Sequence, residues 1–578
     1  MEAVEGQERG RGRGGHPTRK RGSAMRRGSK ALCAAVALVA ASGSLVALPV
    51  TGAAQPPPLP VPATAGALPT PQTDGIVFSV AIVGNTVVAG GRFTKARPAG
   101  VAPGGPGEVR RDNLLAFDLH TGELLPWAPV VSGSTFAGPD PGPFCEPADG
   151  GRWVCDAVFR IKPSPDGRKV YVGGDFDKID GQWRSRVAAF DAVTGALDPA
   201  FRPQVAGRVR GLSVTADSVY LGGGFNAVGG VPRTRLAAVS ASDGALLPWA
   251  PAADREVFAV LAAPELGRVV VGGAFDHVNG VYQHGLTAVD TAGGARVPWQ
   301  WVTPSDSDTI TDLVTDGTGT VYLGSYNWRG GNPRLEGRGA VEIATGRPLW
   351  MDGCYGDTQG VAVADGVLYS ASHTHDCWAI NAVPENGPID YHRLLAETTA
   401  ATGAAQRDIN HVRRGDPIPE LLPWLPNTNG GPSTSPWLNG PWTVDARSGY
   451  VVVGGEFTVV NGVPQQSLTR FAARGVPGVV NNGPQVPFPA PRLSRRLFGG
   501  YNITWNGTWD AQNREVRYEV MRAGTPEPLH VTTAPAWPWT ISEMRFTDQR
   551  PPQGRVEYWV RAVDADGAVL SSPHSTIG

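Results

Sequence analysis

A short phrase that recurs along this chain constrains its fold more than any other feature. It reads VYVGGDFDKIDG at 170–181 and returns as VYLGGGFNAVGG at 219–230, VVVGGAFDHVNG at 269–280 and VVVGGEFTVVNG at 451–462, with VVAGGRFT at 87–94. Each copy opens with a run of β-branched or aromatic residues, which is typical of a buried strand. The glycine pair that follows permits close approach of a neighbouring backbone. The phrase therefore predicts one kind of strand used repeatedly.

A second phrase follows the first in several copies. It reads LLAFDLHTGELLPWAP at 114–129, RVAAFDAVTGALDPAF at 186–201, RLAAVSASDGALLPWAP at 235–251 and GLTAVDTAGGARVPWQW at 285–301. A strand, a turn rich in Thr, Asp and Gly, and a short outer strand account for this pattern.

The glycine pairs at 173, 222 and 272 lie about 50 residues apart, which is the length of a four-stranded propeller blade. Two degenerate copies, at 320–350 and 366–380, complete the series. The repeats predict an all-β fold, a seven-bladed β-propeller over 55–480.

The first 54 residues differ from the rest. Nine Lys and Arg within residues 1–30 precede the uncharged, apolar stretch 31–50, and small residues follow at 51–54. This order predicts a cleaved secretory signal peptide over 1–54, with cleavage within 53–55, and an extracellular protein with no membrane span in the mature chain. An uncleaved membrane anchor is the alternative.

Charge and cysteine usage agree with export. Without the leader the chain keeps a net charge of about −7, whereas proteins that bind nucleic acid usually carry a net positive charge. Four cysteines remain, and they predict two disulfides, Cys145 with Cys155 and Cys354 with Cys377.

Three insertions interrupt the repeats, at 95–112, 131–154 and roughly 382–440; the last includes an expected short helix at 390–397. Long loops on a rigid scaffold are where binding residues tend to lie. At the other end of the ring, Gly66-Ala-Leu-Pro-Thr-Pro71 resembles Gly244-Ala-Leu-Leu-Pro-Trp249. We therefore expect the N-terminal segment to supply the outer strand of the last blade.

Beyond a Pro-rich linker at 481–499, the region 500–578 has short strands with Trp505, Tyr518 and Tyr558 as expected core aromatics. Its YEVMR and YWVRAVDADG segments resemble a fibronectin type III domain. On the GGxFxxxxG and AAFDxxTGxxxP phrases, the region before the linker resembles the exported bacterial β-propellers of the delta-60-repeat type. That resemblance implies a fold and an exported location, but no reaction.

Four tryptophans in Pro-Trp pairs have two readings. Their fixed place in the repeat favours a role in the core between blades, and the alternative is a set of platforms for sugar rings. They are Trp127, Trp249, Trp299 and Trp424. The tryptophans of the long insertion, Trp437 and Trp442, are less bound to the repeat and are candidate ligand-binding residues.

The stretch YSASHTHDCW at 369–378 holds the other candidates, His373, His375 and Asp376, with Asp357 nearby. Alignment on the repeat puts Ser370 and Ala371 on the glycine pair and His373 on the inward phenylalanine. Two histidines at i and i+2, with Asp357 or Asp352, could ligate zinc or another divalent ion. The favoured reading is a disulfide-tied polar loop without a cofactor.

Two functions follow from these patterns. The leading one is a secreted, non-catalytic module that binds an extracellular ligand, such as a glycan or cell-wall component, on the insertion-bearing face. The alternative is a secreted carbohydrate-active hydrolase or lyase with its site near the histidines.

Overall fold

The computed structural model describes residues 58–385 and 387–578. Apart from two 3₁₀ turns, η1 (Pro264–Leu266) and η2 (Trp378–Ile380), the regular structure of these residues consists of strands, so the all-β prediction is confirmed. No helix within these two ranges is long and apolar enough to cross a membrane. The predicted signal peptide over 1–54 lies outside the described residues.

The repeats form antiparallel sheets whose strands follow one another outward in chain order. These sheets are β2 (Ile76–Val83), β3 (Thr86–Arg92), β6 (Leu114–Asp118); β11 (Val158–Pro163), β12 (Lys169–Gly174), β15 (Val187–Asp191); β16 (Val209–Val214), β17 (Ser218–Gly223), β20 (Leu236–Ser240); β21 (Val257–Ala263), β22 (Arg268–Gly273), β25 (Leu286–Asp290); β26 (Asp308–Thr315), β27 (Thr320–Asn327), β28 (Arg338–Glu342), β29 (Pro348–Met351); β30 (Thr358–Ala364), β31 (Val367–Thr374), β32 (His392–Thr398); and β35 (Pro441–Arg447), β36 (Tyr450–Gly455), β39 (Leu468–Ala472).

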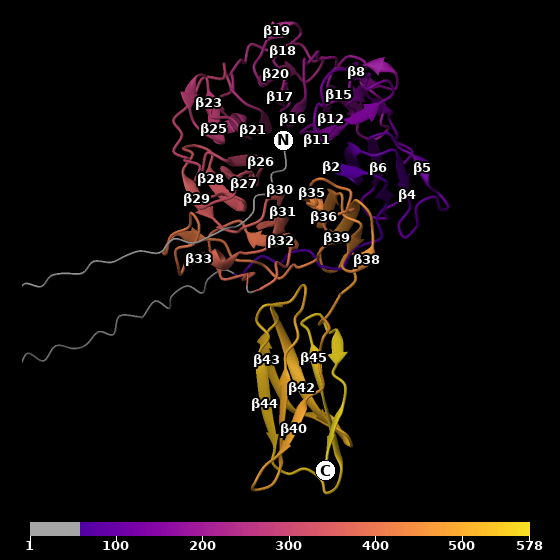
Figure 1. Ribbon diagram of the computed structural model, residues 1–578, viewed down its shortest axis with the longest axis vertical. Coiled ribbons are helices and arrows are strands. Elements are labelled where there is room, and N and C mark those ends of the chain that lie inside the picture. The colour runs from indigo at the N-terminus through magenta and orange to yellow at the C-terminus, as the bar shows by residue number, and fades with distance from the viewer. Residues whose placement is uncertain (1–57, 386) are drawn as a thin grey trace, which may run out of the picture. The chain divides into compact units, whose positions relative to one another are not determined.

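The first strands of successive sheets lie side by side in the order β2, β11, β16, β21, β26, β30 and β35, and β35 lies beside β2 again. The sheets therefore close into a ring around a central axis, with the innermost strands nearest that axis (Figure 1). This is the blade arrangement of a propeller.

Short strands form small sheets of their own beside the main sheets of the ring. They are β1 (Gln72–Thr73), β4 (Lys95–Arg97), β5 (Val109–Arg110), β7 (Val131–Ser132), β13 (Lys178–Ile179), β14 (Gln182–Trp183), β18 (Ala227–Val228), β19 (Val231–Pro232), β23 (His277–Val278), β24 (Val281–Tyr282), β33 (Gly403–Ala404), β34 (Pro417–Ile418), β37 (Val459–Val460) and β38 (Val463–Pro464). The insertion at 131–154 adds a sheet of its own, with β8 (Phe136–Ala137), β10 (Arg152–Val154) and β9 (Glu146–Ala148) in that order.

The repeated glycine pair sets the distance to the next blade and to the neighbouring strand of its own blade. A Cβ on Gly173 would lie 2.8 Å from the Val209 side chain of the next blade, and one on Gly174 would lie 2.2 Å from the carbonyl oxygen of Ala157. Because both distances are shorter than carbon atoms tolerate, a larger residue would push the strands apart.

The Pro-Trp tryptophans fill the space between blades, as predicted for three of the four. Trp127, Trp249 and Trp424 are 3%, 2% and 0% exposed. The indole nitrogen of Trp249 donates a hydrogen bond of 2.8 Å to the carbonyl of Asp290 in the next blade. Trp299 is only half-buried, and Trp301 takes up the fully buried position there.

The N-terminal segment closes the ring, as the sequence predicts. Leu68 pairs with Arg470 of β39 as an antiparallel bridge, and the amide of Thr64 donates 2.8 Å to the carbonyl of Ala472. The last sheet thus receives its outer edge from the start of the described chain, which leaves fewer unpaired backbone groups at that edge.

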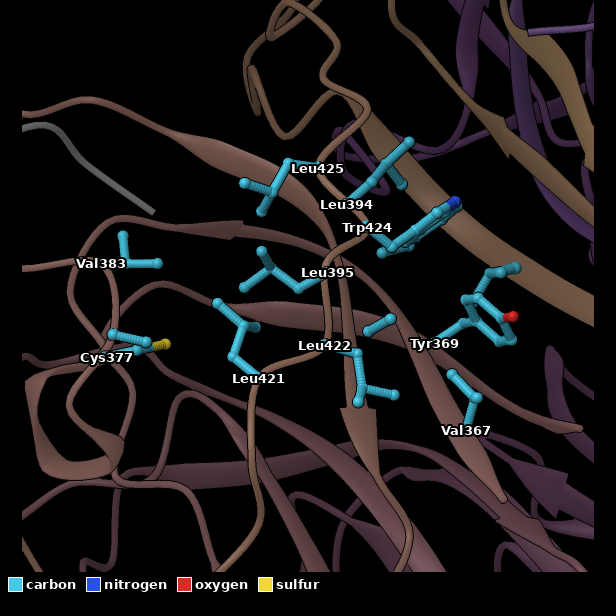
Figure 2. Packing of buried hydrophobic residues seen from close by; sticks show 14 of the residues in the cluster. Val367, Tyr369, Cys377, Val383, Leu394, Leu395, Leu421, Leu422, Trp424 and Leu425 are labelled. Atoms are coloured by element: carbon cyan, nitrogen blue, oxygen red, sulfur yellow. The ribbon is translucent and has the colours of Figure 1, made fainter. Parts of the chain in front are cut away.

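The expected helix at 390–397 is wrong, because this segment forms strand β32 and pairs with β31. Leu394 and Leu395 of this strand share the interior with Leu421 and Leu422 (Figure 2). In the same cluster the indole of Trp424 packs edge-on against Tyr369 at 5.0 Å between ring centroids. Pairing with the neighbouring strand β31 outweighs the local helical tendency of this stretch. Part of the expected insertion is therefore a blade strand.

The C-terminal region forms two sheets. One has the order β40 (Arg492–Arg495), β41 (Tyr501–Asn506), β44 (Glu543–Asp548). The other has the order β43 (Thr525–Pro535), β42 (Glu515–Arg522), β45 (Val556–Val563), β46 (Val569–Ser571), with β47 (Ser575–Ile577) also paired to β45.

The three predicted core aromatics of this region, Trp505, Tyr518 and Tyr558, are buried between the two sheets. Strand β40 lies inside the segment that the sequence assigned to a linker, and Phe488 packs in the same core. The domain therefore starts before residue 500.

Candidate functional site

We number the sheets of the ring as blades in chain order, so that β2–β3–β6 is blade one and β30–β31–β32 is blade six. Blade six places His373 differently from the sequence alignment. In blade two, Val158 pairs with Gly174 and Arg160 with Gly173 across a β-bulge. In blade six, Thr358 pairs with Ser372 and Gly360 with Ala371 across the same bulge. Ala371 and Ser372, not Ser370 and Ala371, therefore match the glycine pair.

This one-residue correction reverses the direction of the side chain. Thr374, which is fully buried, now occupies the place of the inward phenylalanine, and His373 occupies the position of Asp175, between the pair and that phenylalanine. Because successive side chains of a strand point to opposite faces, the His373 side chain points away from the face that buries Thr374. The alignment of His373 with the inward phenylalanine is therefore wrong by one residue.

Every innermost strand carries a β-bulge near its start, which leaves one residue between the paired ones. These residues are Phe78, Phe159, Arg210, Phe258, Thr311, Gln359 and Trp442. Several of them contact the next member: Phe78 lies 5.3 Å from Phe159 and 5.4 Å from Trp442 between ring centroids. We call this set the bulge ring.

Two insertions meet over the bulge ring. The Cys145–Cys155 disulfide closes the insertion at 131–154 beside Phe144. Phe144 stacks on Trp437 of the long insertion at roughly 382–440, at 5.2 Å between ring centroids and 24° between ring planes. Phe144 also lies edge-on to Phe159 at 5.2 Å, and Trp437 lies 5.5 Å from Trp442. Both predicted ligand-binding tryptophans thus belong to one aromatic cluster.

A polar network continues from this cluster to His373. The indole nitrogen of Trp442 donates to Glu456 at 3.3 Å, and the same carboxylate oxygen accepts the amide of Asn439 at 2.9 Å. The Asn439 side chain hydrogen bonds to Nδ1 of His373 at 3.2 Å, and Nε2 of His373 lies 3.8 Å from Asp357. His373, Asp357, Trp437 and Trp442 therefore come together, although the sequence separates them widely.

Burial controls the protonation of the His373 and Asp357 pair. It raises the pKa of Asp357 to about 7, assisted by the negative charge of Glu336, and it lowers the pKa of His373 to about 4. Although the two groups lie at ion-pair distance, the imidazole is neutral at neutral pH and the carboxyl is partly protonated. Such a pair can exchange a proton with a bound molecule.

His375 and Asp376 have hydrogen-bond partners other than those of His373 and Asp357. Nδ1 of His375 lies 2.7 Å from Glu385, and the carboxylate of Asp376 accepts the amide of Trp378 at 2.7 Å, which forms a local turn. Both histidines pack edge-on against Tyr391, at 5.9 Å each. His375 also lines a cavity of about 290 Å³ together with Glu385 and Trp539.

Asp352, one of the metal ligands that the sequence suggested, is paired with a buried arginine. Asp352 is fully buried and lies 2.7 Å from Nε of Arg338. Two groups in the described residues bring three possible ligand atoms together: Cys145, Cys155 and Asp175, and Asp352, Cys354 and Glu397. Since all four cysteines form disulfides, as predicted, none of them offers a thiolate.

Sequence reasoning missed much of the site: Phe144, Phe159, Arg210, Phe258, Tyr326 and Asn439. A signal for the bulge ring exists in the innermost strands, whose starts read VFSV at 77–80, VFRI at 158–161, VRGL at 209–212 and VFAV at 257–260. The second letter of each is the bulge residue. For Phe144 and Asn439, which lie in insertions, no repeat pattern applies.

A family model described as a domain of unknown function (DUF5122), beta-propeller, matches residues 165–201. The chain is a β-propeller protein. No curated protein sequence matches it.

Solved structures similar to this propeller come from several sources. The extracellular domain of the one component system BT4673 from B. thetaiotaomicron aligns with 7% identity and a TM-score of 0.35, over 90% of this chain and 58% of that one. The Dos1 propeller aligns with 10% identity and a TM-score of 0.35, over 72% and 97%. The extracellular domain of the hybrid two component system BT3049 from B. thetaiotaomicron aligns with 10% identity and a TM-score of 0.20, over 86% and 84%. The chain spans little more than half the length of the first of these.

Proposed function

We propose that this chain is an exported, non-catalytic binding module, in which a seven-bladed propeller of the delta-60-repeat type precedes a fibronectin type III-like domain. Its ligand is an extracellular glycan or cell-wall component, bound over the bulge ring on the insertion-bearing face. Nucleic acid is not a partner, and the module needs no cofactor.

The observation that carries this proposal is the contact between the two insertions. Phe144 and Trp437 stack directly, and Phe78, Phe159 and Trp442 surround them. Aromatic faces suit the apolar side of a pyranose ring, and polar groups at the edge suit its hydroxyls. Here Glu456, Asn439 and His373 provide such groups next to the aromatic cluster.

A glycan array tests the proposal, with the mature chain from residue 55 presented to cell-wall and environmental polysaccharides. We expect Trp437→Ala to weaken binding by about tenfold or more, because stacked aromatic residues dominate such contacts. Trp183→Ala is the matched control, because this indole lies on hairpin strand β14 and is 60% exposed. If the protein binds no glycan of the array, or if Trp437→Ala and Trp183→Ala weaken binding equally, the proposed glycan-binding function is contradicted.

The Asp357 and His373 pair favours a second function, a carbohydrate-active hydrolase or lyase. A carboxyl group with a pKa of about 7 beside a neutral imidazole has the properties of a general acid and base. Turnover of a polysaccharide panel that disappears in Asp357→Asn and in His373→Ala, but survives in His375→Ala, would establish the enzyme. Absence of turnover in the wild-type protein eliminates it.

A further inference from the structure

Arg210 occupies an unusual position in the bulge ring. Its guanidinium carbon lies 5.0 Å from the ring centroid of Phe159 and 4.5 Å from that of Phe258, which belong to the blades on either side. Phe144 of the disulfide-closed insertion lies 4.8 Å away. Three aromatic rings thus hold one cation in place, an arrangement that stabilises the charge and restricts the side chain.

The neighbouring arginines, unlike Arg210, have carboxylate partners, although Arg208 also lies over the rings of Phe144 and Phe159. Arg208 lies 2.8 Å from Asp175, and Arg160 lies 2.8 Å from Asp312. The guanidinium of Arg210 has no ion pair and no hydrogen bond within residues 58–385 and 387–578. Its five N–H groups are therefore not used by the surrounding protein, and aromatic rings offer them no strong acceptor.

Arg210 nevertheless stays charged at neutral pH. Burial lowers its pKa to about 10, and the negative charge of Glu256 opposes that decrease. Arg210 is half-buried, and a charge that loses part of its hydration costs free energy unless an anion pairs with it. A ligand that supplies a carboxylate removes this cost.

Polar groups near Arg210 fit the rest of a sugar ring. Burial raises the pKa of Tyr326, and the charges of Arg210, Asp357 and Glu256 all reach its hydroxyl group. Tyr326 also occupies, in blade five, the position that His373 occupies in blade six. Because Asp357 is partly protonated at neutral pH, it repels an incoming anion less than an ordinary aspartate would.

On the basis of the proposed glycan-binding function, we propose that the ligand is an acidic sugar, and that Arg210 pairs with the carboxylate of a uronic acid residue. The phenyl rings of Phe144, Phe159 and Phe258 hold the guanidinium in position for this contact. A carboxylate matches the two parallel donors of an arginine better than a hydroxymethyl group does.

The test compares two probes that differ at one carbon, glucuronate and glucose, each as a free sugar and as the repeating unit of an oligosaccharide. Binding to the mature full chain is measured by calorimetry and by ligand-observed NMR. We expect the acidic probe to bind the wild-type protein about tenfold or more tightly than the neutral one, and Arg210→Gln to abolish the difference. Arg210→Lys should retain only part of it, because an ammonium group lacks the parallel donors.

Arg168→Gln is the matched control. It removes the same charge from a side chain that is 86% exposed, at the opposite end of strand β12 from the glycine pair. Arg168→Gln should leave the affinities for glucuronate and for glucose unchanged. Near-ultraviolet circular dichroism of each variant shows whether the aromatic cluster keeps its packing.

The outcomes separate this inference from the proposed function. Binding of neutral glycans without preference for the acidic probe, or a preference that survives in Arg210→Gln, overturns the role of Arg210 and leaves the glycan-binding module standing. Absence of binding to both probes and to every glycan of the array overturns both. Equal binding of acetate and glucuronate would show that the site recognises a simple anion, and would overturn the acidic sugar.

Discussion

The ring of Phe144 stacks on the indole of Trp437 at 5.2 Å, and this contact joins two insertions that are far apart in the chain. Each insertion alone is a surface loop of the propeller. Together they build an aromatic cover over the bulge ring, where Arg210, Asp357 and His373 also lie. The proposed site therefore depends on loops, while the blades below it hold those loops in register.

The first prediction concerns the disulfide beside Phe144. Replacing Cys145 and Cys155 together by serine should weaken ligand binding, because Phe144 then loses the tie that holds it against Trp437 and Arg210. The melting temperature should change little, since the small sheet of this insertion lies outside the blade cores. Calorimetric binding and differential scanning fluorimetry measure the two effects.

The other disulfide provides the comparison for this pair. Cys354 and Cys377 are both buried, and replacing them by serine should lower the free energy of unfolding by about 2–4 kcal/mol, because the bridge restricts the unfolded chain. If the Cys145 and Cys155 variant loses more stability than the Cys354 and Cys377 variant, the first disulfide does not serve mainly to position Phe144.

The second prediction is a pH dependence of stability that comes from Asp357. Its folded-state pKa is about 7, whereas an unfolded aspartate titrates near about 3.9. The folded state binds the proton more tightly, so the contribution of this group to stability is fully present below about pH 4 and is lost as the pH rises to about 7. Asp357→Asn should therefore gain stability relative to the wild type across that interval.

His373 should show the opposite sign. Burial lowers its pKa to about 4, so its contribution is present above about pH 6.5 and is lost as the pH falls towards about 4. His373→Gln should then gain stability relative to the wild type as the pH falls. Thermal melts in a pH series measure both variants, and parallel curves for wild type and variants would refute the two assignments.

The third prediction concerns the buried charges between blades five and six. Nε and Nη2 of Arg338 lie 2.7 Å from Asp352 and 2.8 Å from Glu397, and all three side chains are buried. Arg338→Val should lower the free energy of unfolding by about 3–5 kcal/mol, because it leaves Glu397 without its partner. Chemical denaturation measures the loss.

A second substitution should recover much of this loss. At the junction of blades two and three the equivalent positions hold Val187 and Val239, which share one buried cluster, so Arg338→Val with Glu397→Val restores the apolar pair of an ordinary junction. Asp352 keeps the amide donors of Arg338 and Cys354 at 3.0 Å each in this background. A double variant less stable than the single one would show that the charges stabilise the blade beyond their pairing.

The fourth prediction concerns closure of the ring. Deleting residues 59–72 removes the bridge between Leu68 and Arg470 and exposes the outer edge of β39. The truncated protein should melt at a lower temperature and self-associate, because an unpaired strand edge recruits other chains. A chain that starts at Leu59 is the control, and light scattering with thermal melts distinguishes the two. Equal melting of both chains would mean that the segment is not needed for closure.

Much of the fold was predictable because the repeat phrases encode local structure. Apolar runs, glycine pairs and Thr-Gly turns specify strands and hairpins within a few residues of themselves, and the period of about 50 residues specifies the blade. The two disulfides followed from the even number of cysteines and from their grouping into two local pairs, and the closing segment followed from its likeness to an outer strand. Strand β32 was missed because its residues lack the repeat pattern and pair only with a strand that is already in place.

The site was less predictable, because it depends on register and on contacts between distant segments. His373 and Asp357 were recognised as candidates, yet the direction of His373 required the pairing of Thr358 with Ser372, since a shift of one residue turns a side chain to the other face. The repeated starts of the innermost strands mark the position of Arg210, but its contacts with Phe144 and Phe258 become apparent only in the folded protein. The sequence by itself determined which segments become strands and how they repeat. Only the tertiary structure decided which side chains meet at the axis, because ring closure brings together residues that no local pattern connects.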